Sequence, residues 1–505
     1  MQNPAYAEKI KAKGHCKMSM NQDKTPLFDA IMEYDVKRPA YFRIPGHRYE
    51  KGINPKWREV VGDKIFGFDL TETPLCDDLH NASGAIKEAE ELASELWGSD
   101  YTHFLVNGST CGNQVAVITT ANEGETICIP RNAHKSALMG LTLGGAKPVY
   151  IAPYIEEEWG LQGGITAAQA EEMFNKYPEC KGMMVVSPSY YGVTSDIKAL
   201  AEVCHAHNAV LLVDEAHGAH CYFSEKLPGG AIAQGADIAV QSIHKVTGSF
   251  TQSSMIHVKS KLISRASLQG NLHLVQSTSP SYVLMTSLDM ARHYMATEGK
   301  MMIDRALELA RDARERINKI SGIRCARKED LEGKAGIYKL DETRLTISAA
   351  AIGITGFNLK KMLFDEYNCD VELSDYRNIL AIVTFANEKE DLDRLVTALE
   401  DIAKRFADGK PLPKAKQLPS QPEFVITPRE AYFSKKRKTV NWADCKGMVM
   451  AEMIAPYPPG IPLIYQGERM SEDVWEYLDD IRARKGHIHG PADVTLETVQ
   501  VIDID

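Results

Sequence analysis

Short apolar runs alternate with helix-like stretches over residues 104–258. Runs of this length bounded by turn-forming residues predict buried β-strands, and they lie at residues 104–106, 126–129, 147–151, 182–186, 209–213 and 238–241. Just before them, residues 86–97 place Ile86, Ala89 and Ala93 on one helical face, with Gly98 as a stop signal. The alternation predicts repeated βα units, and therefore an α/β fold with a mainly parallel sheet.

The rest of the chain predicts two smaller units. Residues 300–320 have the pattern of a long charged helix with Ile303, Leu307 and Ile317 on its inner face. Residues 407–423 hold four prolines among Gly, Ser and Lys, which is typical of an extended linker. We therefore expect an N-terminal arm (1–40), a large domain (41–298), a small α+β domain (299–406), the linker (407–423) and a C-terminal α+β domain (424–505).

The composition argues against several classes of partner. The 505 residues carry a net charge of -10, and no basic stretch with interleaved aromatic residues predicts a nucleic-acid site. No apolar run is long enough to span a bilayer, and the first 24 residues lack the apolar core of a signal peptide. The ten cysteines include no C-x-x-C pair, which favours a reducing compartment. We expect a cytoplasmic protein that binds neither nucleic acid nor membrane.

Lys245 is the strongest candidate for a catalytic residue. It belongs to the segment Ser242-Ile243-His244-Lys245, which follows a predicted strand and precedes Thr247-Gly248-Ser249. A lysine just past the carboxyl end of a buried strand lies in a crevice where desolvation lowers its pKa, so it can form an imine. Ser242 and His244 can bind a phosphate or orient the lysine. A solvated lysine is the alternative for an isolated residue.

Asp214 ends another predicted strand, in the segment Asp214-Glu215-Ala216-His217-Gly218. A carboxylate aimed at a pyridine nitrogen keeps that nitrogen protonated, so the ring can accept an electron pair. Ala216 would let one face of such a ring lie close to the backbone. Alternatively, Asp214 caps the following turn.

Two further strand ends supply complementary groups. The turn at 107–112 places the hydroxyls of Ser109 and Thr110 before a helix that we expect to begin near Asn113, which suits a phosphate or an ordinary helix cap. After the run 126–129, His134 is placed to stack on an aromatic cofactor ring. Four strand ends of one sheet would thus each deliver one part of a site.

Together these segments resemble the fold-type I pyridoxal-phosphate (PLP) enzymes, specifically the ornithine/lysine/arginine decarboxylases. The motifs that carry the resemblance are Asn107-Gly108-Ser109-Thr110, His134, Ser187-Pro188-Ser189-Tyr190-Tyr191-Gly192, Asp214-Glu215-Ala216-His217-Gly218 and Ser242-Ile243-His244-Lys245. Residues 42–47, 77–81, 277–282 and 457–462 resemble further family signatures, so the resemblance covers nearly the whole chain. Only a short arm precedes Pro45-Gly46-His47 here, which implies the short form, most like arginine decarboxylase, without a receiver-like domain.

The resemblance implies a role for each motif residue. PLP would be the cofactor, with Lys245 as its Schiff base, Asp214 on the pyridine nitrogen and His134 stacked on the ring. Its phosphate would be bound by four residues of this chain: Ser109, Thr110, Ser242 and His244. Thr278 would reach the cofactor phosphate from a neighbouring subunit, which implies a homodimer or higher homo-oligomer with shared active sites.

The role of His217 is open, because some relatives carry a large aromatic residue there. His217 would contact the cofactor and the substrate carboxylate, or deliver a proton to Cα. Zinc ligation by Glu215, His217 and His220 is an alternative. We do not expect a metal, because coordination would take these side chains from the turn that faces the cofactor.

The expected reaction is decarboxylation of a small basic amino acid, L-arginine to agmatine and CO2, with lysine or ornithine as alternative substrates. Asp77, Asp78 and Glu468 are candidate partners for the distal cation of the substrate. An aminotransferase or a carbon–sulfur lyase would use the same Lys245 and Asp214, because fold alone does not choose between them. A non-catalytic binding protein would not need an intact Lys245.

Overall fold

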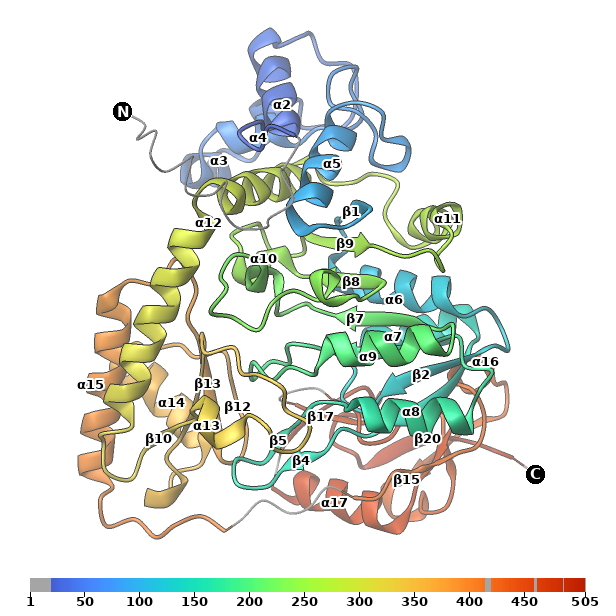
Figure 1. Cartoon of the computed structure of the whole chain (residues 1–505), viewed down its shortest axis with the longest axis vertical. Helices are drawn as coiled ribbons and strands as arrows, with labels where there is room; N and C mark the ends of the chain where they lie inside the picture. Colours follow the sequence, from blue (N-terminus) through green and yellow to red (C-terminus); the bar gives the residue numbers. More distant parts are fainter. Residues whose placement is uncertain (1–19, 414–418, 458–460, 485, 505) are drawn as a thin grey trace.

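The structure is a computed structural model that describes residues 20–413, 419–457, 461–484 and 486–504. Its centre is a seven-stranded sheet in the order β1-β9-β8-β7-β6-β2-β3 (Figure 1). The strands span Tyr101–Leu105, Ser254–Val258, Ile238–Gln241, Val210–Asp214, Gly182–Val186, Thr126–Pro130 and Lys147–Ile151, in that order. All neighbours from β8 to β3 pair in parallel, whereas β9 pairs antiparallel to both β1 and β8.

Both faces of the sheet are buried. Successive side chains along each strand point to opposite faces, so neighbouring residues belong to different core clusters. Leu212 belongs to one core cluster, whereas Leu211 and Val213 belong to another. The first cluster is closed by helices α6 (Gly108–Thr120), α7 (Lys135–Gly144) and α11 (Arg265–Val275), and the second by α8 (Ala167–Lys176) and α9 (Ile197–Ala206). This two-faced burial explains why the strands are continuous apolar runs. The predicted α/β fold with a mainly parallel sheet is confirmed.

Helix α12 (Tyr282–Ile317) is longer than the sequence predicted, with 36 residues. It begins well before residue 300 and runs from the N-terminal region down to the small domain, so it crosses the expected boundary at 298 (Figure 1). The hydrophobic pattern did not predict the first half of this helix, because that half is buried among other helices. Amphipathic periodicity appears only where a helix has a solvent face.

The expected N-terminal arm is only partly described. Residues 1–19 lie outside the described residues, whereas Pro26–Lys37 form helix α2, which packs on α12 and on α5 (Ala85–Trp97). The buried pair Asp289–Arg292 of α12 anchors this segment. Asp289 accepts from the backbone of Leu27, and Arg292 donates to the carbonyl of Gln22.

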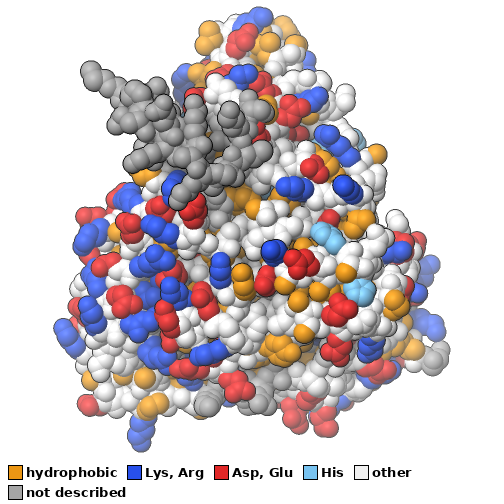
Figure 2. Space-filling view, in the orientation of Figure 1, with side chains coloured by type: hydrophobic (Ala, Val, Ile, Leu, Met, Phe, Trp, Pro, Cys, Tyr) orange, Lys and Arg blue, Asp and Glu red, His pale blue; other side chains and the backbone are white. Residues whose placement is uncertain are grey.

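The small domain has a four-stranded sheet, β10-β11-β13-β12, covered by the second half of α12 and by two further helices. The strands span Arg324–Cys325, Arg344–Ser348, Asn378–Ile382 and Leu373–Ser374, and the helices are α14 (Gly356–Tyr367) and α15 (Lys389–Arg405). Figure 2 shows basic and acidic side chains interspersed over the visible face of this region.

The C-terminal region forms a five-stranded sheet, β14-β18-β16-β20-β15. Its strands span Glu423–Phe424, Glu468–Arg469, Val449–Met450, Thr498–Ile502 and Arg437–Asn441, with helices α16 (Pro428–Phe433) and α17 (Glu472–Ala483). It lies beside the β2–β3 end of the large sheet (Figure 1). Residues 414–418 of the expected linker and 458–460 of the motif at 457–462 lie outside the described residues. Among the described helices, none is long and apolar enough to cross a bilayer.

Candidate active site

Lys245 lies on the short helix α10 (Ile243–Val246), which directly follows β8. Its Nζ is 2.9 Å from Nε2 of His217 and 5.2 Å from the ring centroid of Tyr190. Burial lowers the pKa of Lys245, although the charges of Asp214 and Glu372 partly oppose that shift. Burial therefore makes the neutral, nucleophilic form of this amine easier to reach than it is for a solvent-exposed lysine.

His217 is the polar partner of that amine. Burial holds the pKa of His217 well below its ordinary value, and the nearby charges of Lys245 and Arg344 act in the same direction. The imidazole is therefore neutral, and its Nε2 accepts a hydrogen bond from Lys245 Nζ. Its Nδ1 is buried and has no hydrogen-bond partner among the described residues.

Asp214 ends β7 and is buried. One carboxylate oxygen accepts from the side-chain amide of Asn113 (2.8 Å), and the other accepts from the backbone N–H of Ala216 (3.2 Å). Both partners fix the orientation of the carboxylate. They leave lone pairs available for a protonated ring nitrogen.

The helix after β1 begins earlier than the sequence predicted. Helix α6 starts at Gly108, whose φ of +75° suits a glycine, so Ser109 and Thr110 lie in its first turn and Asn113 in its second. Ser109 Oγ is 2.8 Å from Ser242 Oγ. The start of α6 and the end of β8 therefore present two hydroxyls and backbone N–H groups together, as an anion site requires. His244 donates from Nδ1 to the carbonyl of Ser253, which fixes its ring.

His134 caps the start of α7, and its Nδ1 accepts from the backbone N–H and the hydroxyl of Ser136. Ser136 in turn accepts from Asn113 at 3.1 Å. Burial lowers the pKa of His134, against the opposing charge of Asp214, so the ring is kept neutral. One hydrogen-bond network thus joins the predicted stacking residue to the predicted partner of the pyridine nitrogen.

The structure brings most of the predicted residues into one cluster, but not Thr278. This residue is exposed in the loop between α11 and α12, and no described contact joins it to Lys245. The sequence also missed functional neighbours. Asn113 was named only as the expected start of a helix, and Tyr190 stood within a motif without a role. Ser136 and Arg344 were not singled out. Arg344 is fully buried and donates to the carbonyl of His217 at 2.9 Å. No local signal marked it, because it comes from the small domain.

The three acids proposed for the distal cation all have structural partners. Asp77 accepts from the backbone N–H groups of Ser83, Gly84 and Ile86 at the start of α5. Asp78 accepts from His80 N, and Glu468 is paired with Arg131. Glu372 is instead the exposed acid whose charge acts on Lys245.

The described residues bring possible metal donors together at His220, Cys221 and Asp341, not at the set Glu215, His217 and His220. His220 Nε2 is 2.9 Å from Asp341, and Arg344 Nε lies 3.4 Å from the same oxygen. Burial raises the pKa of Cys221 well above its ordinary value. A guanidinium beside a protonated thiol disfavours a cation, so this cluster is an internal ion-pair network.

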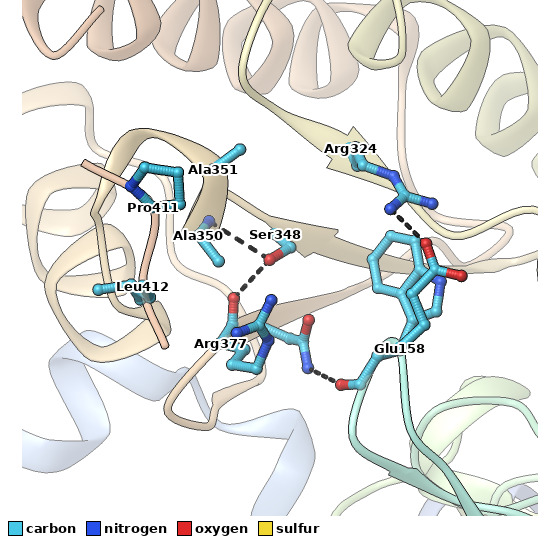
Figure 3. A pocket seen from close by; sticks show the side chains of 10 residues that line it. Glu158, Arg324, Ser348, Ala350, Ala351, Arg377, Pro411 and Leu412 are labelled. Atoms are coloured by element: carbon cyan, nitrogen blue, oxygen red, sulfur yellow. Dashed lines mark hydrogen bonds and ion pairs between the residues drawn. The ribbon is translucent and has the colours of Figure 1, made fainter. Parts of the chain in front are cut away.

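A hollow of about 230 Å³ lies elsewhere, between the loop of β4 (Ile155–Glu156) and β5 (Leu161–Gln162) and the small domain. Glu158, Arg324, Ser348 and Arg377 line it, and no residue of the Lys245 cluster does (Figure 3). The hollow is therefore separate from the candidate site.

The donor set around Lys245 fits PLP. Such a cofactor needs an amine for its aldehyde, a binding site for its phosphate, a carboxylate for its ring nitrogen and a planar side chain that stacks on its ring. Lys245, the Ser109–Ser242 pair, Asp214 and His134 supply these four requirements, from the ends of β8, β1, β7 and β2. Strand ends at one edge of an α/β sheet are where such a ligand binds.

Comparisons with known proteins agree with this arrangement. The sequence matches two family models, described as "Orn/Lys/Arg decarboxylase, major domain" over residues 25–391 and "Orn/Lys/Arg decarboxylase, C-terminal domain" over residues 413–492. An arginine decarboxylase of Bacillus subtilis (strain 168) is 38% identical over 96% of this chain and 99% of its own length. An arginine decarboxylase of Halalkalibacterium halodurans is 38% identical over 95% and 98%.

Solved structures share the fold. The lysine decarboxylase of Francisella novicida superposes with a TM-score of 0.83, at 22% identity, over 95% of this chain and 81% of that one. An alanine–glyoxylate aminotransferase from Nostoc sp. gives a TM-score of 0.51, at 17% identity, over 63% and 86%. The fold is therefore that of the fold-type I PLP enzymes. On the match of both domains and of nearly full-length relatives, the chain belongs to the Orn/Lys/Arg decarboxylase family.

Proposed function

We propose that the protein decarboxylates L-arginine to agmatine and CO2 with PLP as its cofactor. PLP chemistry is supported by one observation: the amine of Lys245, whose pKa burial lowers, lies beside His217 and in the field of the buried Asp214. Decarboxylation, as against transamination, is supported by the match to the Orn/Lys/Arg decarboxylase family. The choice of arginine is supported by relatives that carry this name along nearly their whole length.

Each residue of the cluster has a part in this proposal. Lys245 would hold the cofactor covalently, and bound PLP would supply the electron sink that loss of CO2 from Cα requires. Asp214 would keep the ring nitrogen protonated, and His134 and Ala216 would flank the ring. The phosphate would be held by Ser109, Thr110, Ser242 and His244. His217, neutral and hydrogen-bonded to Lys245, orients that amine and relays a proton to Cα.

Glu372 is proposed to bind the distal cation of the substrate. Its carboxylate is exposed, and its charge raises the pKa of Lys245 against the effect of burial. A carboxylate offers two oxygens in one plane, which match the planar fork of a guanidinium better than a single ammonium. Glu372→Gln should therefore raise KM for arginine far more than it lowers kcat. A Glu390→Gln variant, which changes an exposed acid at the start of α15, is the matched control.

The active unit is proposed to be a homodimer or a larger assembly, with Thr278 completing the site of the neighbouring subunit. Large apolar side chains are exposed near this loop and near Lys245: Leu274 is 73% exposed and Phe250 is 51% exposed. Apolar side chains so exposed in one chain suit an interface between copies. A cytoplasmic location is supported by the cysteines, since the nine in the described residues are free thiols.

The test of the substrate is a comparison of kcat/KM for arginine, lysine and ornithine at one pH, with CO2 and the amine product both measured. Arginine should give the highest value, with CO2 and agmatine in equal amounts and without any keto acid. Faster turnover of lysine or ornithine would reassign the substrate. A requirement for a keto-acid acceptor would reassign the reaction class.

A further inference from the structure

Arg131 connects the C-terminal domain to the turn that carries His134. It directly follows β2, and its guanidinium contacts only C-terminal residues through its two described hydrogen bonds: Glu468 at 2.5 Å and the carbonyl of Leu463 at 2.8 Å. Its Cζ lies 4.2 Å from the ring centroid of Tyr465. The hydroxyl of Tyr465 also donates to the backbone carbonyl of Arg131, at 3.2 Å. Side chain and backbone of Arg131 therefore both contact the C-terminal domain. Within the large domain, its backbone N–H donates to the carbonyl of Ile151 at 2.7 Å and its Cζ lies 5.1 Å from the ring centroid of Tyr150.

The far end of helix α7 is held in the same way. Gln466 donates to the hydroxyl of Thr142 at 2.9 Å, and Arg429 donates to the carbonyl of Leu143 at 2.7 Å. His134 caps the near end of this helix. The element that carries the stacking residue is thus fixed at both ends by the C-terminal domain.

The contact at Arg131 is buried. The side chain of Arg131 is 11% exposed and that of Glu468 is 0% exposed. Tyr465 belongs to the same core cluster as Ile129 and Ala133, on either side of Arg131. A buried charge left without its partner is strongly unfavourable, so the loss of Glu468 would force Arg131, and the turn with it, to move.

We propose that Arg131 is a positioning residue of the active site: through Glu468 and Tyr465, the C-terminal domain sets the orientation of the His134 ring over the cofactor. This inference rests on the proposed function, because it requires His134 to stack on the ring of a bound PLP. It also gives the C-terminal domain a function in catalysis beyond its own folding, and it assigns Glu468 to Arg131 and not to the substrate.

Glu468→Gln is the first test, because it keeps the shape of the side chain and removes its charge. We expect kcat for arginine to fall by about tenfold or more with KM nearly unchanged, since small misplacements of a group at the reacting centre are costly. The visible circular dichroism of the bound cofactor should change with it. Tyr465→Phe, which removes only the hydroxyl bond to Arg131, should show the same changes at smaller size, with a smaller loss of Tm than Glu468→Gln.

The decisive comparison repeats Glu468→Gln in a His134→Ala background. If Arg131 acts through His134, the two losses in kcat are not additive, and Glu468→Gln has little further effect once the ring is gone. The double variant Arg131→Leu/Glu468→Leu leaves no unpaired charge. Its Tm should return toward the wild-type value from the lower Tm of Glu468→Gln, whereas its kcat should stay low.

Glu123→Gln is the matched control. It removes an exposed acid that lies 3.7 Å from Arg429, at the other contact between the same two domains. It should leave kcat, the dichroism and Tm unchanged. Additive losses in the His134→Ala background, or a double leucine variant with full activity, would overturn the inference and leave Arg131 a purely stabilising residue. Absence of any visible cofactor band in the wild-type protein would instead overturn the proposed function.

Discussion

At the scale of the residue, the site is held by hydrogen bonds that no sequence motif predicted. Asn113 donates to Asp214 and to Ser136, and Ser136 donates to His134, so one amide orients both the nitrogen partner and the stacking ring. Arg344 and Lys245 add positive charge around His217, which keeps that imidazole neutral together with burial.

Replacing Asn113 by Ala tests this network. Asp214 would lose the amide bond at 2.8 Å, and a hydrogen bond to a charged group contributes about 1.5–3 kcal/mol. The variant should bind the cofactor, since Ser109 and Ser242 are untouched, while kcat falls by about tenfold or more. Steady-state kinetics on the cofactor-saturated enzyme measure the loss. Unchanged kcat would show that Asp214 does not need Asn113.

Buried histidines make the stability of the protein depend on pH. Burial lowers the pKa of His257 to about 3, so the folded protein keeps this ring neutral while the unfolded chain protonates it below about pH 6.5. The stability that it contributes is present above pH 6.5 and is lost as pH falls toward 3. The loss approaches about 1.4 kcal/mol per pH unit for each such group.

His257→Gln should flatten that slope between pH 6.5 and pH 4, although the variant is less stable overall. Urea unfolding at several pH values gives the slope. His487→Gln, which changes an exposed histidine, is the control and should leave it as it is. An unchanged slope in His257→Gln would mean that this ring is protonated in the folded state.

At the scale of the element, α6 lies directly against the sheet, and this close approach positions the turn that we propose to bind the phosphate. A Cβ added at Gly112 would meet Val240 at 2.5 Å and Leu105 at 2.7 Å. Val240 belongs to β8, the strand that leads to Lys245. The close approach of α6 to β8 therefore brings Ser109 to Ser242.

Gly112→Ala should push α6 away from β8. Overpacking of this kind costs about 1–3 kcal/mol, and the affinity for PLP should fall as the two hydroxyls separate. Gly270→Ala in α11 is the matched control, since nothing lies within 4 Å of its added Cβ. The control should keep or raise Tm, because alanine favours a helix. Equal PLP affinity in both variants would contradict the account.

Elements were predictable from the sequence where burial gives them a simple pattern. The six predicted runs are all strands, because a parallel sheet covered on both faces requires continuous apolar segments. Strand β9 was missed, since Ser254 and His257 interrupt its apolar pattern. The residues at strand ends were also predictable, because parallel strands end at one edge. Asn113, Ser136 and Arg344 were not, because their roles depend on packing between elements distant in sequence.

At the scale of the whole molecule, Thr278 and Lys245 test whether sites are shared. Each site of a dimer would take Lys245 from one subunit and Thr278 from the other. Mixing equal amounts of Thr278→Ala and Lys245→Ala proteins should form half heterodimers with one intact site each, and so restore about a quarter of wild-type activity. No recovery in mixtures shown to contain heterodimers would exclude sharing.

The central claim is that Lys245 holds the cofactor. Reduction of the protein with borohydride, followed by digestion and mass spectrometry, measures this directly, because reduction makes the link between the lysine and PLP permanent. The account predicts that a reduced phosphopyridoxyl group is found on the peptide that contains Lys245, and that Lys245→Ala protein has neither this label nor the visible cofactor band. Label on another lysine, or active wild-type protein without label at Lys245, would contradict it.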